Sequence, residues 1–398
     1  MAAVDPAGHV TSPAGFRAGA TYAGVKTYGD GKLDLAILVS DYPCTTAAVY
    51  TRNRLHAASI DINRAKLAER PARGVVVNAG VANASTGERG LRDGYELARL
   101  AAGHAGIPAE EMLVCSTGVI GHFLPMEKLG GAMPSIVLHR DGGPEFARAI
   151  MTTDTRPKSG AVRFGPYTIG GSCKGSGMIH PNMATMLAFL TTDAPVEGVF
   201  LQQVFAKAVD DSFNLVSVDG DTSPSDTALL FANGAAGGDP IRPGHPLVAE
   251  FEAALRDLCV YLAKEIARDG EGATRLIEFT VTGAATAEDA RKLVRLLSTS
   301  YLLKSAVHGA DPNWGRIAAV VGRSGVDLNE EAVTIDLCGT RVFERARPTA
   351  FDADALSAAM RASEVEIRVD LGVGSAAATG WGCDLSADYV AINADYHT

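Results

Sequence analysis

The sequence predicts a mixed α/β protein. Short apolar runs typical of strands alternate with longer segments whose apolar residues recur at helical spacing. Of the 398 residues, 47% are hydrophobic and 21% are charged, the composition of a globular chain with enough apolar side chains for a sizeable core. This length allows roughly two or three domains, or one large intertwined unit.

The expected strands are short apolar segments bounded by turn residues. Residues 33–39 and 46–51 are separated by a turn at Tyr42 and Pro43, and residues 186–190 form an apolar run that we interpret as a buried strand. Another apolar strand is expected to follow the acidic turn that begins at residue 217. The remaining strands are predicted at 74–78, 112–115, 161–164, 167–173, 275–281, 333–337 and 365–370.

The expected helices have apolar residues on one face. Leu91, Leu97 and Leu100 follow this spacing in 89–102, and 199–213 carries a similar apolar stripe. The other helices are predicted at 144–151, 247–268, 287–298 and 353–360, with one more expected after a loop within 304–322. The longest helix ends in DGEGAT, residues 269–274, where Glu271 lies between two glycines that favour a helix end.

Charge and motif content exclude several classes of function. The net charge of −10 argues against a nucleic-acid partner. Six single cysteines, without CxxC spacing, and nine histidines, without an HExxH pair, indicate neither a disulfide framework nor a metal site. The Walker and dinucleotide-binding motifs are absent, so we predict no cofactor. We find no secretory signal and no apolar run of ~18 residues, so we expect a cytoplasmic protein without a membrane partner.

Three aspartates occur in the acidic turn SVDGDTSPSDT. Asp219, Asp221 and Asp226 could suggest a calcium site, but the loop lacks EF-hand spacing and the glutamate that would complete it. We interpret all three as turn caps.

The stretch KGSGMIHPNMATMLAFLTT, residues 174–192, is the first candidate for chemistry. If the chain breaks before Thr185, this residue supplies both a hydroxyl nucleophile and a free α-amine. The α-amine has an unperturbed pKa of roughly 7.7–8.0 and can accept the proton of the hydroxyl group. Threonine at the start of a strand is also common for structural reasons, so the residues alone leave both interpretations open.

Two turns rich in small residues are candidates for backbone contacts to a ligand. NAGVANASTG, residues 78–87, permits either a close approach of its amides to a ligand or a tight strand-to-helix turn. The strand at 112–115 leads into Thr117 and Gly118, whose N–H groups could bind an anion as an oxyanion hole does. Most turns of this kind have no such role.

Five segments in order resemble one family over nearly the whole chain: KGSGMIHPNMATMLAFLTTDA, VDGDTSPSDT, DGEGAT, DPNWGRI and INADYHT. They are similar to the ornithine acetyltransferase family, also called glutamate N-acetyltransferase. The resemblance implies an αββα sandwich of the type shared with self-processing aminopeptidases. It also implies a smaller C-terminal α/β part at roughly 280–398.

The resemblance further implies self-cleavage between Ala184 and Thr185. The products would be an α chain of residues 1–184 and a β chain of residues 185–398, which stay together and assemble as α2β2 or a larger unit. The implied reaction moves an acetyl group from N2-acetylornithine to glutamate in arginine biosynthesis. Acetyl-CoA stays open as an additional donor.

The family pattern assigns roles to individual residues. Thr185 would carry out the cleavage and accept the acetyl group, and Thr117 with Gly118 would form the oxyanion hole. A lysine can pair with a substrate carboxylate and a glutamate with an ammonium group. The implied substrate-binding residues are Thr152 (preferred to Thr153), Lys174, Thr185, Glu271, Asn393 and Thr398.

The chain departs from the family at one motif. Members often have NSGNANAC where this sequence has NAGVANAS, so Ala79, Val81 and Ser85 replace two polar residues and a cysteine. This difference bears on specificity for the donor or acceptor. The alternatives are an aminopeptidase or amidase on the same scaffold, an acetyltransferase with a specialised acceptor, and a non-catalytic ligand-binding protein.

Overall fold

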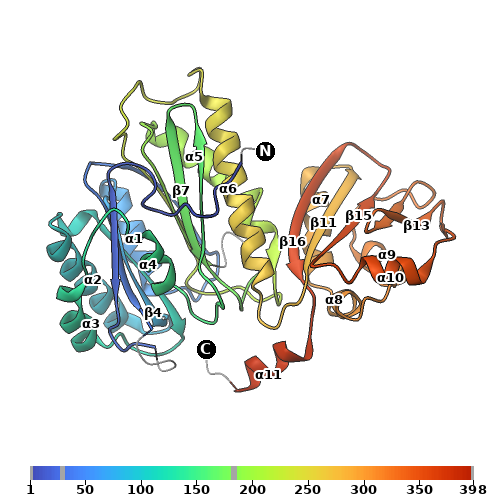
Figure 1. The fold of residues 1–398 in the computed structure, drawn as a ribbon, viewed down its shortest axis with the longest axis horizontal. Helices are drawn as coiled ribbons and strands as arrows, with labels where there is room; N and C mark the ends of the chain where they lie inside the picture. Colours follow the sequence, from blue (N-terminus) through green and yellow to red (C-terminus); the bar gives the residue numbers. More distant parts are fainter. Residues whose placement is uncertain (1–2, 27–31, 181–185, 396–398) are drawn as a thin grey trace.

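Two β-sheets stack face to face in the larger lobe of the protein (Figure 1). The structure, a computed structural model, describes residues 3–26, 32–180 and 186–395. The first sheet has the order β1 (Phe16–Thr21), β2 (Leu35–Ser40), β4 (Gly74–Val81) and β5 (Met112–Val119). The second has the order β3 (Thr45–Tyr50), β10 (Thr227–Ala232), β8 (Leu187–Thr192), β7 (Tyr167–Lys174) and β6 (Lys158–Phe164).

Helices cover the outer face of each sheet. The first sheet packs against α1 (Ala58–Glu69) and α2 (Gly87–Ala105), and α3 (Met126–Ala132) packs on α2. The second sheet packs against α5 (Gly198–Asp210) and α6 (Val248–Arg268), while α4 (Gly143–Ala149) contacts strands of both sheets. This arrangement is an αββα sandwich, so the predicted fold class is confirmed.

The continuous apolar run of β8 follows from its place between two layers. Leu187 and Phe189 point into the core between the sheets, whereas Ala188 and Leu190 point toward α5 and α6. Successive side chains of a strand face opposite sides, so a strand covered on both sides needs apolar residues at every position. The sequence LAFL meets this requirement.

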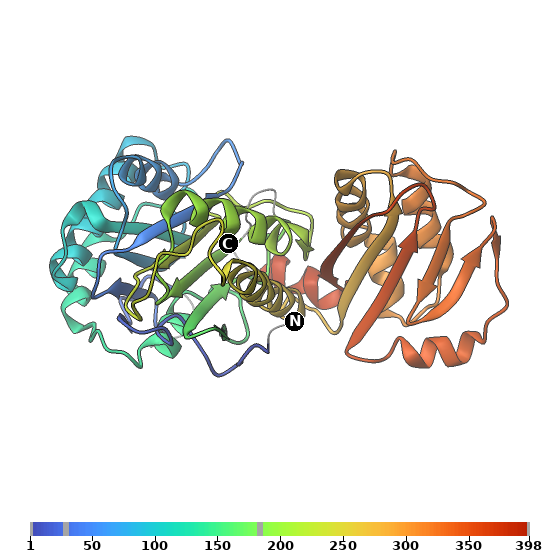
Figure 2. The same ribbon diagram turned by 90° about the horizontal axis from the view of Figure 1, so that it is seen from above.

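A third sheet forms the smaller lobe (Figures 1 and 2). Its order is β14 (Arg347–Pro348), β13 (Thr340–Glu344), β12 (Thr334–Leu337), β15 (Glu364–Asp370), β11 (Leu276–Ala284), β16 (Ala376–Cys383) and β9 (Val216–Ser217). The helices here are α7 (Ala287–Ser298), α8 (Tyr301–His308), α9 (Trp314–Arg323) and α10 (Ala353–Ala359). Because Trp381 and Cys383 of β16 belong to the core beneath α6, this sheet is continuous with the packing of the larger lobe.

The last helix returns from the third sheet toward the larger lobe (Figure 1). This helix, α11 (Ala387–Asp395), packs closely on the loop after α6: a Cβ atom at Gly272 would lie 2.5 Å from the Tyr389 nitrogen. Gly272 also has φ +69°, a conformation that favours glycine. Across the described residues, no helix combines the length and apolarity that crossing a membrane requires.

The elements differ from the prediction at several ends. The segment 304–322 was expected to be a loop followed by one helix, but residues up to His308 complete α8 and α9 begins at Trp314. Asp311 and Pro312 occupy the break, where proline cannot continue the first helix. Strands β4 and β5 extend to Val81 and Val119, beyond their predicted ends. Short 3-10 helices occur at Ala109–Glu111, Met133–Ser135 and Phe213–Leu215.

Candidate active site

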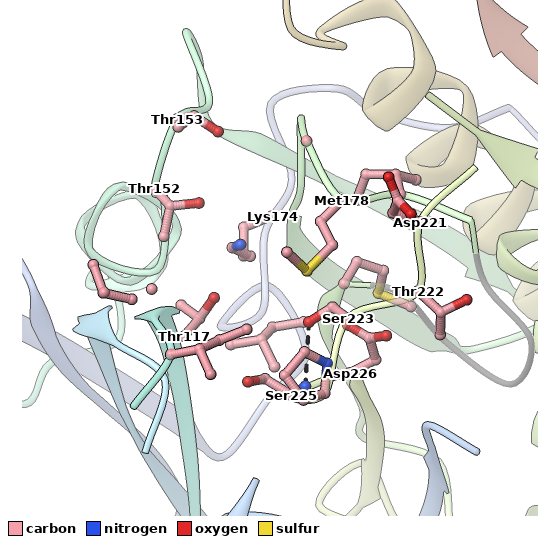
Figure 3. A pocket seen from close by; sticks show the side chains of 18 of the residues that line it. Thr117, Thr152, Thr153, Lys174, Met178, Asp221, Thr222, Ser223, Ser225 and Asp226 are labelled. Carbon is pink, nitrogen blue, oxygen red and sulfur yellow. Dashed lines mark hydrogen bonds between the residues drawn. The ribbon is translucent and has the colours of Figure 1, made fainter. Parts of the chain in front are cut away.

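A cavity of about 410 Å³ lies where strand ends from both sheets of the sandwich meet the loop after α6 and helix α11. Figure 3 shows Thr117 and Thr152 on one side, Lys174 near the centre and Asp226 with its loop on the other side. The structure brings six of the predicted site residues to this cavity: Thr117, Gly118, Thr152, Lys174, Glu271 and Asn393.

Two glycines shape the wall formed by β4 and β5. Gly80 and Gly118 face each other across the parallel pair, at an irregularity in the register, with φ +118° and +128°. A Cβ atom on Gly118 would lie 2.2 Å from the carbonyl carbon of Gly80, so the two backbones approach more closely than other residues permit. This close approach places Thr117 and the Gly118 backbone at the cavity wall, where an anion could be bound.

Of the three departures from the family motif, only one side chain is at the cavity. Ser85 lines it, whereas Ala79 is fully buried and Val81 is absent from the lining. The change at Ser85 is therefore the one that can touch a ligand directly.

Thr152 and Thr153 both line the cavity but differ in their contacts. The Thr153 hydroxyl lies 3.1 Å from the Ser176 hydroxyl, so it is already hydrogen-bonded within the protein. The backbone N–H of Thr152 donates to Asp154 Oδ2 at 2.9 Å, and its side chain makes no hydrogen bond with the described residues. This difference favours Thr152 as the threonine with a hydroxyl available to a ligand.

Lys174 ends β7 and is only 8% exposed. Burial lowers the pKa of its ammonium group, while the carboxylates of Asp154, Asp226 and Glu271 act in the opposite direction. A buried lysine among carboxylates at a cavity wall is suited to hold an anionic group of a ligand.

Glu271 and Asn393 meet at another wall of the cavity. The Asn393 side-chain amide donates to Glu271 Oε2 at 2.8 Å and so connects α11 to the loop after α6. Gly177 allows the Glu271 carboxylate to lie against the chain, since a Cβ atom there would be 2.3 Å from Oε1. The pair offers a carboxylate and a polar amide to the same part of a ligand.

Ala184, Thr185 and Thr398, also predicted as site residues, lie outside the described residues. Thr185 is nevertheless bonded to Met186, which lines the cavity. The Thr227 N–H donates to the Met186 carbonyl at 3.0 Å and fixes Met186 beside the start of β10.

The acidic loop corrects one prediction. Asp219 is a turn cap as expected, because its Oδ1 accepts a hydrogen bond from the N–H of Asp221 at 3.1 Å, and its carboxylate also accepts from the N–H groups of Met178 and Ile179. For Asp226 the prediction is wrong: its side chain lines the cavity, is 2% exposed, and its Oδ2 has no hydrogen-bond partner among the described residues. The only sequence signal was an aspartate placed directly before a mostly apolar strand, TALLFA.

Burial raises the pKa of the Asp226 carboxyl well above its usual range, against the opposing effects of Ser223 and the Lys174 charge. A raised carboxyl pKa favours the protonated form in the folded state. The associated stability is therefore present below the unfolded-state pKa of ~3.9 and is lost as the pH rises through the folded-state pKa. Asp226 thus lowers stability at neutral pH, as functional residues often do.

We expect Asp226→Asn to stabilise the uncleaved protein at pH 8. In a Thr185→Ala background, its free energy of unfolding should rise by ~1.4 kcal/mol for each unit by which burial raises the carboxyl pKa, because the neutral amide has no charge to bury. The gain should shrink as the pH falls toward ~4. Thermal unfolding at several pH values measures this gain. Asp221→Asn, a change at an exposed neighbour, is the control, and its free energy of unfolding should stay at the parent value. A less stable Asp226→Asn at pH 8 would contradict the assignment.

The fold and the cavity define a mixed α/β protein with an αββα sandwich and a charged cavity of substrate size at its strand ends. Residues 17–398 match the ArgJ family model, so the chain belongs to the ArgJ family. Within the described residues, no group of His, Cys, Asp and Glu side chains is arranged to hold a metal ion.

Individual relatives agree over nearly the full length. The chain is 48% identical over 397 residues to the arginine biosynthesis bifunctional protein ArgJ of Dehalococcoides mccartyi, covering 99% of this chain and 98% of the relative. It is 50% identical over 390 residues to the protein of the same name from Thermus thermophilus, covering 98% of this chain and 100% of the relative. The predicted family, and with it an acetyltransferase role in arginine biosynthesis, are confirmed.

A crystal structure of the arginine biosynthesis bifunctional protein ArgJ from Bacillus halodurans is also similar. It is 42% identical in sequence, with a TM-score of 0.51. The match covers 97% of that crystal chain but 52% of this chain. The matched crystal chain thus corresponds to about half of the protein described here.

Proposed function

We propose that this chain cleaves itself between Ala184 and Thr185 and then transfers acetyl from N2-acetylornithine to glutamate through Thr185. The observation that carries the proposal is the position of Met186. This residue lines the same cavity as Thr117, Gly118, Lys174 and Glu271, and the peptide bond to Met186 holds Thr185 next to it. Cleavage would leave residue 185 as a chain end beside this charged cavity.

The half-length match in the crystal supports the cleavage. The chain after Ala184 would contain 214 of the 398 residues, counted as 398 − 184. This share is close to the 52% of the chain that the crystal chain of the Bacillus halodurans relative covers. In the cleavage step, Thr185 Oγ attacks the Ala184 carbonyl carbon and the C–N bond breaks to give an ester. The hydroxyl proton passes to the departing nitrogen, so the Thr185 α-amine is free in this ester. Water then hydrolyses the ester, which leaves a carboxylate on Ala184 and restores the Thr185 hydroxyl.

Acetyl transfer uses the new chain end. Thr185 Oγ attacks the acetyl carbonyl of N2-acetylornithine as its proton passes to the α-amine. The hydroxyl of Thr117 and the N–H of Gly118 stabilise the oxyanion. The C–N bond then breaks, the α-ammonium returns the proton to the departing ornithine nitrogen, and an acetyl ester remains on Thr185. Glutamate reverses these steps: its amine attacks the ester carbonyl and Thr185 Oγ leaves with the proton.

The charged groups of the cavity match amino-acid substrates. Lys174 binds a substrate carboxylate and Glu271 an ammonium group, each through a charge-assisted hydrogen bond. Asn393, Thr152 and Thr398 supply neutral polar contacts in this proposal. The half-buried and buried positions of Thr152, Lys174 and Glu271 would strengthen these contacts by excluding water.

We expect a ping-pong pattern in initial-rate measurements, because the first product must leave before glutamate binds. Double-reciprocal plots against acetylornithine at several glutamate concentrations should give parallel lines. Ornithine should also appear in stoichiometric amount when glutamate is omitted. Intersecting lines, together with no ornithine release without glutamate, would exclude the covalent relay. Testing acetyl-CoA as the donor in the same assay shows whether the enzyme uses one acetyl donor or two.

We also propose that the cleaved chains remain together as α2β2 or a larger assembly in the cytoplasm. The intertwined sandwich supports the association, since β3 pairs with β10, and β7 with β8, across the proposed cleavage point. Light scattering of the purified protein after gel filtration measures the assembly. Separation of the two fragments without denaturant would contradict the proposal.

A further inference from the structure

A buried ion cluster lies behind the cavity. The ammonium group of Lys158, the first residue of β6, contacts Asp154 Oδ1 at 2.6 Å and also Asp269 Oδ2. The three side chains are between 0% and 3% exposed. Burying an ion pair costs several kcal/mol of desolvation per ion, and well-packed apolar residues often stabilise a fold as well or better. Stability alone therefore does not account for this cluster, which points to another role.

Asp154 is the member that reaches the cavity segments. Its Oδ1 accepts a hydrogen bond from the N–H of Gly175 at 2.7 Å, and its Oδ2 accepts one from the N–H of Thr152 at 2.9 Å. Gly175 follows Lys174 directly. One carboxylate therefore fixes the backbone at Thr152 and immediately after Lys174, the two residues predicted to bind substrate. Both contacts are to backbone groups and depend on the position of the carboxylate.

Asp269 connects the third segment. It ends α6 and accepts hydrogen bonds from Thr155, including one from the backbone N–H at 3.1 Å. Two residues later, the N–H of Glu271 donates to the Ser176 carbonyl at 2.9 Å. The cluster thus joins the segments that carry Thr152, Lys174 and Glu271 into one buried unit.

The electrostatic surroundings of Lys174 single out Asp154. The charged groups near the Lys174 ammonium include Asp154 from the loop before β6, Lys158 from β6, Asp226 before β10, Glu271 after α6 and Lys26 after β1. Asp154 has the largest effect of these, and it opposes the lowering of the Lys174 pKa by burial. Asp269, in contrast, contacts Lys158 and Thr155 and not the backbone at Thr152 or Gly175.

We propose that Asp154 is a positioning residue of the acetyl-transfer site. It holds the backbone at Thr152 and Gly175 and presents its negative charge to Lys174, while Lys158 and Asp269 fix its own position. The Lys174 part rests on the proposed function, in which Lys174 binds a substrate carboxylate. The proposal also accounts for Lys158, a buried lysine that does not line the cavity.

The test measures the charge of Lys174 directly in Asp154→Asn. Brief labelling with acetic anhydride at a series of pH values, followed by mass spectrometry, gives the midpoint at which Lys174 becomes reactive. The midpoint should fall by ~1–3 pH units when the nearby opposite charge is removed. Glu265→Gln is the control: it also removes one carboxylate charge, but Glu265 is on α6 and pairs with Arg156 at 3.0 Å, so the Lys174 midpoint should stay in place. An unchanged midpoint in Asp154→Asn would overturn the proposal.

Kinetics provide a second readout. In Asp154→Asn, the alkaline fall of kcat/KM should move to lower pH with the labelling midpoint, whereas Asp154→Glu, which retains the charge, should return it toward the parent value. A purely structural role would lower activity equally at every pH, and that result would contradict the proposal. Because labelling needs no acetyl transfer, a correct midpoint shift in a protein without transferase activity would refute the proposed function alone.

Asp269→Asn keeps the test decisive if Asp154→Asn does not fold. This variant retains Asp154 and both of its backbone contacts, so the labelling midpoint of Lys174 should remain at the parent value. A shift as large as the one predicted for Asp154→Asn would mean that any charge in the cluster acts on Lys174, and would overturn the assignment to Asp154.

Discussion

Thr185→Ala should yield one intact chain of 398 residues without transferase activity. The substitution removes the hydroxyl that the account requires for both cleavage and acetyl transfer. On a denaturing gel, the parent protein should run as fragments of 184 and 214 residues (398 − 184) and the variant as a single band. We expect kcat to fall by at least ~10³-fold, since losing a catalytic nucleophile costs up to ~10⁶-fold in enzymes of this type of chemistry.

Thr185→Ser is the matched control, because serine keeps the hydroxyl and, after cleavage, the α-amine. It should cleave, although more slowly, and retain a measurable rate. Thr191→Ala, a change at a buried threonine later in β8, tests whether loss of any threonine hydroxyl in this strand blocks cleavage. If Thr185→Ala still cleaved itself and kept full activity, the proposed role of Thr185 would be wrong.

Thr117→Ala should lower kcat by ~10²–10³-fold, the usual effect of removing one oxyanion-hole donor. The cavity wall at Thr117 and Gly118 is the part of the described site suited to bind a developing negative charge. A donor of this kind acts on the transition state, so KM for both substrates should change little. Steady-state kinetics with acetylornithine and glutamate measure the effect.

Thr117→Ser should recover most of the rate because it restores the hydroxyl. Gly118→Ala is unsuitable as a probe: its Cβ would overlap the Gly80 backbone, at 2.2 Å from the carbonyl carbon, and the strand pair would have to move. If Thr117→Ala and Thr117→Ser lose the same activity, the hydroxyl is not the donor and the assignment fails.

The strands of the sandwich were predictable where one or both faces are uniformly apolar. Residues 186–190 and 112–115 were recognised because every position is hydrophobic, and the structure places them in β8 and β5. In contrast, β1, with the sequence FRAGAT, and β16, with AAATGWGC, were not predicted. Their small residues permit close backbone packing but give no alternation of large apolar and polar side chains, which is the signal for a strand.

Helix α1 was missed for a related reason. Its buried residues include Ser59 and Asn63, and Asn63 exchanges hydrogen bonds with the backbone of Val114. A helix that faces the core with polar side chains has no apolar stripe, so periodicity cannot reveal it. The short helix α11 has no buried residue among those described and was missed too.

Most of the candidate site was predictable only from the motif resemblance, although the strand-end turn at Thr117 and Gly118 was already a candidate from its residues. Thr117, Lys174, Glu271 and Asn393 are far apart in sequence, and the cavity forms only after both sheets and α11 are in place. Asp154 and Lys158 lie in the segment TTDTRPK, which has no recognisable motif. Their ion cluster forms only when Asp269, more than a hundred residues away, pairs with Lys158 in the folded chain. Burial and pairing, which carry their chemistry, are properties of the folded chain.

The most direct test is the mass of the fragment 185–398 after incubation with N2-acetylornithine alone, quenched in acid. The account predicts that the fragment gains one acetyl group, that peptide sequencing places it on Thr185, and that adding glutamate removes it as acetylglutamate. An unmodified fragment 185–398 in a protein that still transfers acetyl, with or without an acetyl group on Lys174 in the fragment 1–184, would contradict it.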